Sequence, residues 1–349
     1  MTKSLVTVAV LNTLTGQYID LLRELEPRAH YVFDPELVAP SRFASDYDGD
    51  PDFTRNDNRQ KRFDDMLMQA DVFFGIPDAK PAKLAEAVRA SNKLKWVHTI
   101  YAGGGAQVRA ARLTEDELAS VQWTMSAGVH ARPLAEWALM GVLAGIKDLP
   151  RHLRQQRNHH WQRWTMRTLD SLDAVVIGLG EVGRACADIF RTHAMTVRGV
   201  NRSLKDIPGF SRIVTTDKIV EGVSGAHVLV NALPGTPSTK AMISHQVLAA
   251  LAPGAIVVSI GRGSAIDEGA LIAHIRSGHI GFAALDVFER EPLANDSPLW
   301  DMDNVLIAPH TACFTKKEPE NIVRLFANNL TRFIDGQPLR NPINTVEWY

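Results

Sequence analysis

Short apolar runs alternate with segments of helical spacing along almost the whole chain, and this pattern restricts the fold more than any other feature. In the N-terminal part, strand-like runs at 5–11, 70–76 and 94–100 are separated by helical segments at 16–25 and 80–91. Such alternation is typical of α/β folds that contain a parallel sheet. The sequence therefore predicts an α/β protein.

The alternation stops near residues 112–128, and a long helical region follows at 131–147. Six further strand-like runs come after it, at 174–178, 195–200, 226–233, 255–260, 281–288 and 304–309. Six strands at this spacing predict a doubly wound nucleotide-binding sheet. A last helix is predicted at 319–336, because Gly336 and Pro338 are typical stop signals. A chain of 349 residues favours two domains.

The composition argues against several classes of protein. A formal net charge of −1 disfavours a general nucleic-acid-binding or anionic-membrane surface. The two cysteines, Cys186 and Cys313, do not make a disulfide framework, which fits a reducing compartment. The longest apolar region, 134–146, is too short to cross a membrane, and the N-terminal stretch is interpreted as a strand rather than a signal peptide. We therefore expect a cytoplasmic protein.

The sequence AVVIGLGEVG places Gly178, Gly180 and Gly183 directly after a strand-like run and at the start of a helical one. Glycines at this spacing permit a tight turn and let the backbone approach a pyrophosphate, which then meets free N–H groups at the positive end of the helix. This context predicts a dinucleotide-binding loop that includes Glu181 and Val182. Glu181 is a departure, because it adds negative charge near the pyrophosphate unless its side chain points into solvent. The alternative is an ordinary glycine-rich turn.

The end of the next predicted strand indicates which dinucleotide is bound. An acidic residue about 20 positions after the glycines would bind a ribose 2′-hydroxyl. The chain instead has Asn201, Arg202 and Ser203, with no carboxylate. A cation and small hydrogen-bonding groups suit a 2′-phosphate, so NADP(H) is preferred and NAD(H) is the alternative. In the other interpretation, Arg202 and Lys205 are solvated loop charges.

Arg262, Glu291 and His310 each lie at or just after the end of a predicted strand. Such strand ends border the crevice in which open parallel sheets bind ligands. Arginine can bind a substrate carboxylate at two points, and histidine can donate a proton to a carbonyl oxygen as hydride arrives at carbon. Glutamate would orient the imidazole. The set suits reduction of a 2-oxo acid, although singly these residues could be a surface ion pair, a loop cap and a turn residue.

The chain resembles the D-isomer-specific 2-hydroxyacid dehydrogenase family, which includes glyoxylate/hydroxypyruvate reductases and phosphoglycerate dehydrogenases. The matching stretches are VVIGLGEVG, VNALPGTPSTKAMI, VVSIGRGSAIDEGALIAHIRSGHIGFAALDVFEREPL and NVLIAPHTA. The resemblance implies that Arg262, Glu291 and His310 are the catalytic residues, with His310 as general acid/base and Glu291 orienting it.

The same resemblance implies further contacts. Gly103 and Gly104 in YAGGG match a loop whose backbone N–H groups bind the substrate carboxylate, which Arg262 and His310 also contact. The additional residues expected to line the cofactor are Leu233, Pro234, Thr239, Ile260, Gly261, Arg262, Asp286 and His310.

Other segments bear on assembly and specificity. The stretch AGVHARPLAEWALMGVLAG, residues 127–145, resembles the family's interdomain and dimer-forming helix, which implies a homodimer. Cys313 and Phe314 stand where the family usually has a small residue, so the rim of the site differs. The polar stretch 39–60 is predicted to be a long loop that shapes specificity. The adjacent His159 and His160 lack an accompanying ligand set, and no metal is expected.

We therefore predict two Rossmann-like or flavodoxin-like α/β domains. The NAD(P)-binding domain, 126–315, is inserted into a substrate domain made of 1–125 and 316–349. The predicted activity is NADP(H)-preferring reduction of a small 2-oxo acid of the glyoxylate/hydroxypyruvate type to the D-2-hydroxy acid. The expected partners are these small acids, not nucleic acids or membranes. Two alternatives stay open: an NAD(P)-sensing interaction protein of the corepressor type, and an NAD-dependent phosphoglycerate- or formate-type dehydrogenase.

Overall fold

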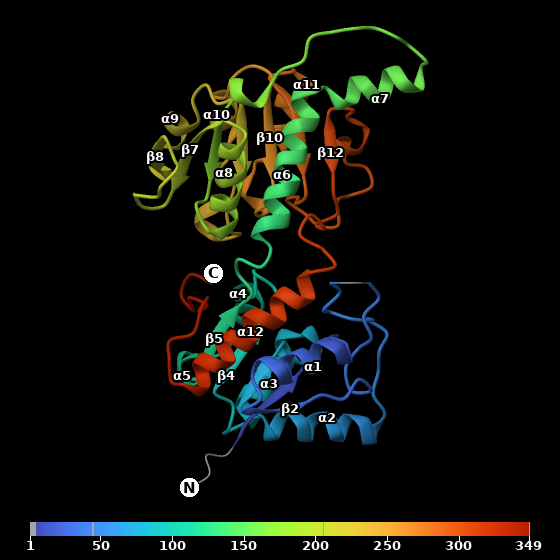
Figure 1. Ribbon diagram of the computed structural model, residues 1–349, viewed down its shortest axis with the longest axis vertical. Helices are drawn as coiled ribbons and strands as arrows, with labels where there is room; N and C mark the ends of the chain where they lie inside the picture. Colours follow the sequence, from blue (N-terminus) through green and yellow to red (C-terminus); the bar gives the residue numbers. More distant parts are fainter. Residues whose placement is uncertain (1–4, 44, 205, 349) are drawn as a thin grey trace. The chain divides into compact units, whose positions relative to one another are not determined.

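The chain forms two compact α/β units in the computed structural model, which describes residues 5–43, 45–204 and 206–348. Unit 1 consists of Met1–Val129 together with Phe314–Tyr349, and unit 2 is His130–Cys313 (Figure 1). Unit 2 is thus inserted into the sequence of unit 1. The divisions fall at 129/130 and 313/314, where the sequence predicts 125/126 and 315/316.

Unit 1 is built on a parallel five-stranded sheet of order β2-β1-β3-β4-β5. Its strands are β1 (Val6–Val10), β2 (Ala29–Val32), β3 (Val72–Phe74), β4 (Trp96–Thr99) and β5 (Gln122–Met125). Its helices are α1 (Gly16–Leu25), α2 (Asp57–Gln69), η1 (Pro77–Ala79), α3 (Pro81–Ala90), α4 (Gly105–Ala110), α5 (Glu115–Ser120) and α12 (Glu318–Ile334). Apolar side chains fill both faces of the sheet, against α2, α3 and α4 on one side and against α1 and α12 on the other.

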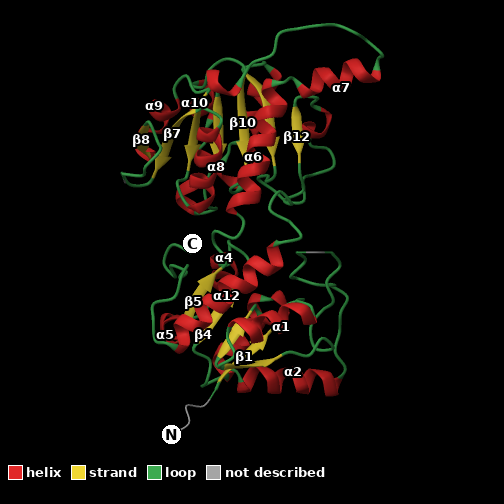
Figure 2. Cartoon of the chain, viewed as in Figure 1, coloured by secondary structure: helices red, strands yellow, loops and turns green. Residues whose placement is uncertain are grey.

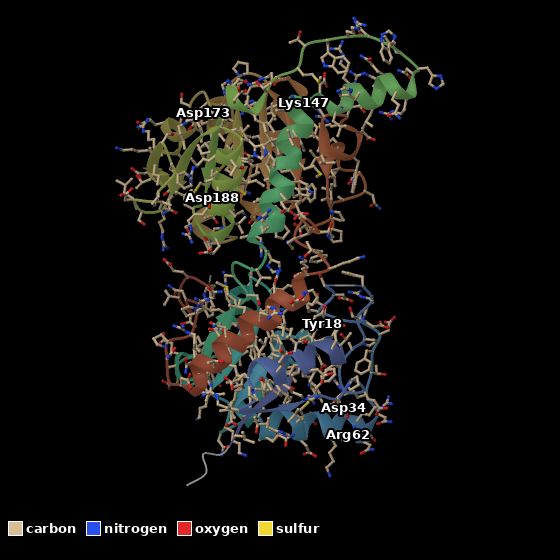
Figure 3. The ribbon with its side chains drawn as sticks, viewed as in Figure 1. Tyr18, Asp34, Arg62, Lys147, Asp173 and Asp188 are labelled. Atoms are coloured by element: carbon tan, nitrogen blue, oxygen red, sulfur yellow. The ribbon has the colours of Figure 1, made fainter. Side chains whose placement is uncertain are left out.

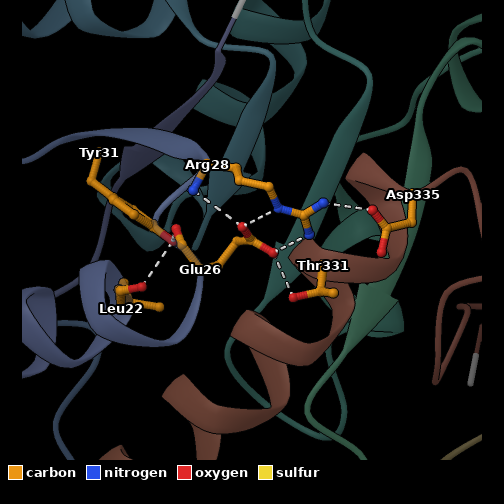
Figure 4. A network of polar contacts seen from close by, with 6 residues as sticks. All are labelled: Leu22, Glu26, Arg28, Tyr31, Thr331 and Asp335. Atoms are coloured by element: carbon orange, nitrogen blue, oxygen red, sulfur yellow. Dashed lines mark hydrogen bonds and ion pairs between the residues drawn. The ribbon is translucent and has the colours of Figure 1, made fainter.

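Helix α12 packs on β3 and β4 through aromatic stacking and is joined to the segment between α1 and β2 by a polar network. The Phe326 ring stacks on Phe74 at 4.0 Å and on Trp96 at 5.0 Å between centroids. In Figure 4, the guanidinium of Arg28 bridges the carboxylate of Glu26 (2.6 Å) and that of Asp335 (2.7 Å), and Glu26 also accepts a hydrogen bond from Thr331. The C-terminal helix is therefore part of the core of unit 1.

Unit 2 is a parallel seven-stranded sheet of order β12-β11-β10-β9-β6-β7-β8 (Figure 2). Its strands are β6 (Asp173–Ile177), β7 (Thr196–Asn201), β8 (Arg212–Thr215), β9 (Val228–Asn231), β10 (Ala255–Ser259), β11 (Ile280–Leu285) and β12 (Val305–Ile307). Its α-helices are α6 (Ala131–Ile146), α7 (Leu149–Arg157), α8 (Glu181–Thr192), α9 (Ile219–Val223), α10 (His245–Ala249) and α11 (Glu268–Arg276). Short 3-10 turns are η2 (Leu169–Ser171), η3 (Thr216–Lys218), η4 (Pro237–Thr239), η5 (Gly263–Ala265) and η6 (Pro298–Asp301).

The order in which strands are added to the sheet of unit 2 reverses at β6. This strand comes first in the chain and lies between β7 and β9, so later strands extend the sheet on both sides of it. Helices α6 and α8 cover one face, and α9, α10 and α11 cover the other. In doubly wound sheets of this order, ligands bind outside the carboxyl ends of the strands next to the reversal. Both units are thus the parallel α/β layers that the sequence predicts.

The boundaries of several elements differ from the predictions. Strands β2, β5 and β8 were not anticipated, and all three lie at sheet edges. The predicted loop 39–60 is shorter, because α2 begins at Asp57, where the Asn56 side chain caps the helix by accepting a hydrogen bond from the Arg59 amide. Asp34 and Arg62, labelled in Figure 3, form an ion pair that holds α2 to the segment after β2. Among the described residues, no helix combines the length and apolar character needed to span a bilayer.

Candidate active site

The glycine turn after β6 has the shape of a cradle. Gly178 has φ +94°, and a Cβ there would lie 2.8 Å from the Ala232 carbonyl oxygen. A Cβ on Gly183 would lie 1.9 Å from the Gly178 oxygen, so only glycine lets α8 start so close to the strand. By contrast, a Cβ on Gly180 would meet no atom within 4 Å. The space outside Gly180 is open.

Helix α8 starts at Glu181 with Gly180 as N-cap, and no side chain caps its first amides. Free amides at a helix N-terminus bind anions, so the turn fits the pyrophosphate of a dinucleotide. The Glu181 side chain is 58% exposed and forms an ion pair with Arg184 on the next turn. Its charge is therefore partly balanced at the surface. Val182 is half-buried and packs on the α6–α8 side of the sheet.

The end of β7 carries polar and basic groups. The Asn201 amide donates a hydrogen bond to the Ser203 carbonyl (3.0 Å), which shapes the turn, and Arg202 is exposed. No acidic side chain occurs in the described stretch 201–204. Lys205, the other cation considered for this turn, lies outside the described residues.

The ends of β9 and β10 are joined by side-chain hydrogen bonds. Buried Asn231 donates to the Ser259 hydroxyl and to the Arg262 carbonyl, both at 3.1 Å, and accepts from the Leu233 amide. A Cβ on Gly261 would lie 2.4 Å from the Leu233 oxygen. Asn231 thus fixes both strand ends, although sequence reasoning did not single it out.

Four more of the predicted cofactor contacts, Leu233, Pro234, Thr239 and Ile260, lie in the loops that follow these two strands. Leu233 and Ile260 are buried, and the hydroxyl of Thr239 donates to the Pro234 carbonyl at 2.6 Å. The Thr239 hydroxyl therefore closes the 234–239 loop on itself.

His310 and Glu291 are in direct contact. The His310 Nδ1 lies 2.7 Å from the Glu291 Oε2, and the other carboxylate oxygen accepts a hydrogen bond from the Phe288 amide at 3.0 Å. Burial alone would raise the pKa of Glu291. The hydrogen bonds from His310 and Phe288, with the charge of Arg262, outweigh burial and hold that pKa below its usual value. Glu291 is therefore an anion beside the imidazole.

Asp286 holds the backbone of the His310 turn. Its buried carboxylate accepts hydrogen bonds from the amides of Thr311 (2.8 Å) and Ala312 (2.9 Å). Its carbonyl accepts a third from the His310 amide (2.9 Å). These bonds stabilise the left-handed conformation of His310, φ +55°. The family resemblance implies that Asp286 lines the cofactor, a role that these contacts do not test.

Arg262 follows β10, Glu291 follows β11 and His310 follows β12. The three side chains therefore come from the carboxyl ends of three adjacent strands. The Arg262 guanidinium is half-buried and donates to the Gly261 carbonyl at 2.8 Å. Its other N–H groups make no hydrogen bond to a described residue, so they can bind a planar anion. The described residues contain no group of three or more His, Cys, Asp or Glu that could hold a metal ion.

Gly103 and Gly104 belong to unit 1, in the loop after β4. A Cβ on Gly104 would lie 1.7 Å from the Thr99 hydroxyl, so the loop requires glycine there. Beneath it, fully buried His98 contacts the hydroxyls of Thr124 (2.7 Å) and Ser126 (3.1 Å). Burial lowers the pKa of His98 to about 3, so its ring is neutral and fixes the ends of β4 and β5.

Comparison with known proteins places the chain in a family. Residues 139–312 match the model of the NAD-binding domain of D-isomer specific 2-hydroxyacid dehydrogenases. A solved D-isomer specific 2-hydroxyacid dehydrogenase from Xanthobacter autotrophicus, in complex with NADPH and MES, is 29% identical, with 99% of each chain covered and a TM-score of 0.79. A family member from Aeromonas salmonicida is 28% identical, with 98% of this chain and 100% of that chain covered and a TM-score of 0.77.

A more distant structure shares the fold. The NADPH-dependent glyoxylate/hydroxypyruvate reductase of Sinorhizobium meliloti, in complex with NADP and sulfate, is 21% identical, with 99% of this chain and 100% of that chain covered and a TM-score of 0.76. The chain belongs to the D-isomer specific 2-hydroxyacid dehydrogenase family. It is therefore an NAD(P)-dependent oxidoreductase.

Proposed function

We propose that the protein reduces a small 2-oxo acid of the glyoxylate/hydroxypyruvate type to the D-2-hydroxy acid, with NADP(H) preferred. In this proposal unit 2 is the NAD(P)-binding domain and unit 1 the substrate domain. The observation that carries it is the 2.7 Å contact between His310 and Glu291, on the sheet edge from which Arg262 also projects.

The roles follow from the contacts. The Glu291 carboxylate accepts a hydrogen bond from the Nδ1–H of His310. The other ring nitrogen, Nε2, is then the atom that gives a proton to the carbonyl oxygen of the substrate. The Arg262 guanidinium binds the substrate carboxylate, as do the backbone amides of Gly103 and Gly104. A reduced nicotinamide, when bound at the glycine turn, would supply the hydride for C2 and be left in its oxidised form. One hydride and one proton then account for the conversion of the carbonyl to a hydroxyl.

The preference for NADP(H) rests on the turn after β7. A ribose 2′-phosphate needs a cation and hydrogen-bond donors, and Arg202 with the 201–203 backbone provides them. The related Xanthobacter enzyme was solved with NADPH, which supports this choice.

We also infer a homodimer that uses the exposed side of α6 and the start of α7. An apolar groove of about 460 Å³ runs there, lined mainly by Leu139, Met140, Leu143 and Leu149. Lys147, labelled in Figure 3, closes one end of α6 and donates to the Arg167 carbonyl at 2.7 Å. Exposed apolar surface of this kind is typical of an interface.

A substrate panel tests the proposed activity. Oxidation of NADPH and of NADH would be followed with glyoxylate, hydroxypyruvate, pyruvate, phenylpyruvate and 2-ketoisocaproate. The proposal expects turnover of glyoxylate and hydroxypyruvate, faster with NADPH at limiting cofactor. Absence of turnover with every acid would contradict it.

A further inference from the structure

A small polar pocket lies in unit 1 at the carboxyl ends of three adjacent strands. Asn12 follows β1, Gly75 follows β3 and Tyr101 follows β4, and the pocket is completed by Tyr47 and Asp48 from the loop before α2. Its volume is about 10 Å³. That is room for roughly one water-sized group.

The Tyr47 hydroxyl, on a residue that lines this pocket, lacks a well-formed hydrogen bond. The side chain is only 6% exposed, and its oxygen makes no hydrogen bond of full geometry to a described residue, although the Ser45 side chain lies near enough to lower the Tyr47 pKa. The ring is held edge-on against Tyr101, with 6.0 Å between centroids and 76° between planes. Buried hydroxyls are nearly always hydrogen-bonded, so an unpaired one that lines a pocket points to a group from outside the chain.

The charges around the pocket define that group. The pKa of Tyr101 is raised by burial and further by Asp48, to which its hydroxyl donates. Burial, with the nearby carboxylate of Glu318, raises the pKa of Tyr47 as well. Both phenols are therefore protonated donors in a negative setting. An anionic tail would be repelled, whereas an alcohol can accept from Tyr47 and donate to Asp48.

The position of the pocket links it to the substrate. Tyr101 begins the loop in which Gly103 and Gly104 are proposed to hold the substrate carboxylate. In a 2-oxo acid only the carbonyl carbon separates that carboxylate from C3, so a group on C3 lies close to the same loop. We propose that Tyr47 and Asp48 form the subsite for the C3 hydroxyl of a 3-hydroxy-2-oxo acid. This inference rests on the proposed function and makes Tyr47 the residue that favours hydroxypyruvate over glyoxylate and pyruvate.

The test removes the hydroxyl alone. In Tyr47→Phe, kcat/KM for hydroxypyruvate is expected to fall roughly 10-fold, while the values for glyoxylate and pyruvate stay within about 2-fold. Tyr31→Phe is the matched control, because its hydroxyl is also buried in unit 1 but donates to the carbonyls of Leu22 and Glu26 (Figure 4). It should not change the ratio between substrates. An unchanged hydroxypyruvate value in Tyr47→Phe, or an equal loss with all three acids, would overturn the inference.

A binding measurement separates this inference from the proposed function. If no acid is turned over by the unmodified protein, the proposed function fails, and titration of its NADP⁺ complex with D-glycerate and with glycolate by calorimetry still tests the pocket. The inference expects D-glycerate, but not glycolate, to bind roughly 10-fold more weakly to Tyr47→Phe than to the unmodified protein. Equal binding of D-glycerate to both proteins would overturn it.

Discussion

His310 is held at its ring and at its backbone by two different carboxylates. Glu291 contacts the Nδ1 of the ring, and Asp286 accepts the amides that follow it. The contact with Glu291 favours one tautomer of the imidazole, and the hydrogen bonds to Asp286 restrict the backbone at His310. A proton donor held in this way loses little entropy when a substrate arrives.

Replacing the ring tests its role as proton donor. His310→Ala should lower kcat by a factor on the order of 10²–10⁴, because the carbonyl oxygen would lack its acid. Stopped-flow or steady-state oxidation of NADPH measures this. Binding of NADPH, followed by its fluorescence, should change little. A kcat equal to that of the unmodified enzyme would remove His310 from the mechanism.

The lowered pKa of Glu291 predicts a pH-dependent stability. A carboxylate with a depressed folded-state pKa stabilises the fold above the ordinary value of 4.5, and this contribution is lost as the pH falls through the folded-state pKa. Glu291→Gln should therefore have a lower Tm than the unmodified protein near neutral pH, and the difference should shrink in acid. Glu289→Gln, an exposed neighbour, is the control. A Tm difference that is the same at every pH would contradict this.

The turn after β7 predicts a cofactor-specific loss. Arg202→Ala should weaken NADPH roughly 10-fold while NADH changes far less, since only NADPH carries the 2′-phosphate. Fluorescence titration of both cofactors measures the ratio. Arg212 is an exposed arginine at the amino end of β8, whereas the turn follows the carboxyl end of the neighbouring strand β7. Arg212→Ala should therefore change the affinity for neither cofactor. Equal losses for the two cofactors in Arg202→Ala would refute the assignment.

At the scale of elements, the β6–α8 unit depends on two glycines for different reasons. Gly183→Ala places a Cβ against the Gly178 oxygen and should destabilise the fold by about 1–3 kcal/mol. Gly180→Ala meets nothing in the protein, so its Tm should be unchanged, but its Cβ enters the space left for the pyrophosphate and should weaken NADPH. Thermal unfolding and cofactor titration together distinguish the two. A Gly180→Ala protein with normal NADPH affinity would argue against a dinucleotide at this turn.

Which elements could be predicted from the sequence follows from burial. Central parallel strands such as β9 and β10 are buried on both faces and therefore appear as continuous apolar runs. The missed strands have an exposed edge and mixed sequences: AHYV in β2, QWTM in β5 and RIVT in β8. Asn56 is a typical helix N-cap residue and could have indicated the start of α2, but it lies within the polar stretch that was interpreted as a loop.

The candidate site divides in the same way. The glycine turn, and the positions of Arg262, Glu291 and His310 at strand ends, could be predicted because parallel strands bring their carboxyl ends to one edge. The partners of Asn231 and Asp286 could not, because they depend on which backbone amides and carbonyls come within reach after folding. The unpaired hydroxyl of Tyr47 likewise has no signature in the sequence.

At the scale of the whole molecule, the proposed dimer predicts a change of mass. Met140 is 45% exposed on α6, and Met140→Glu would place a charge in the apolar groove. Light scattering after gel filtration should show twice the chain mass for the unmodified protein and the chain mass for the variant. Val220→Glu, at a similarly exposed apolar position on α9, should stay dimeric. A monomeric unmodified protein would contradict the proposed dimer.

Helix α12 carries a consequence for synthesis on the ribosome. One apolar face of the β1–β5 sheet is covered by α1 and by α12, and α12 is translated after the whole of unit 2. Unit 2 is therefore expected to fold first, although it begins later in the chain. Ribosome-bound chains that stop before residue 318 should give a protease-resistant unit 2 and a protease-sensitive N-terminal part. The N-terminal part of unit 1 is therefore expected to complete its fold only after α12 has been synthesised.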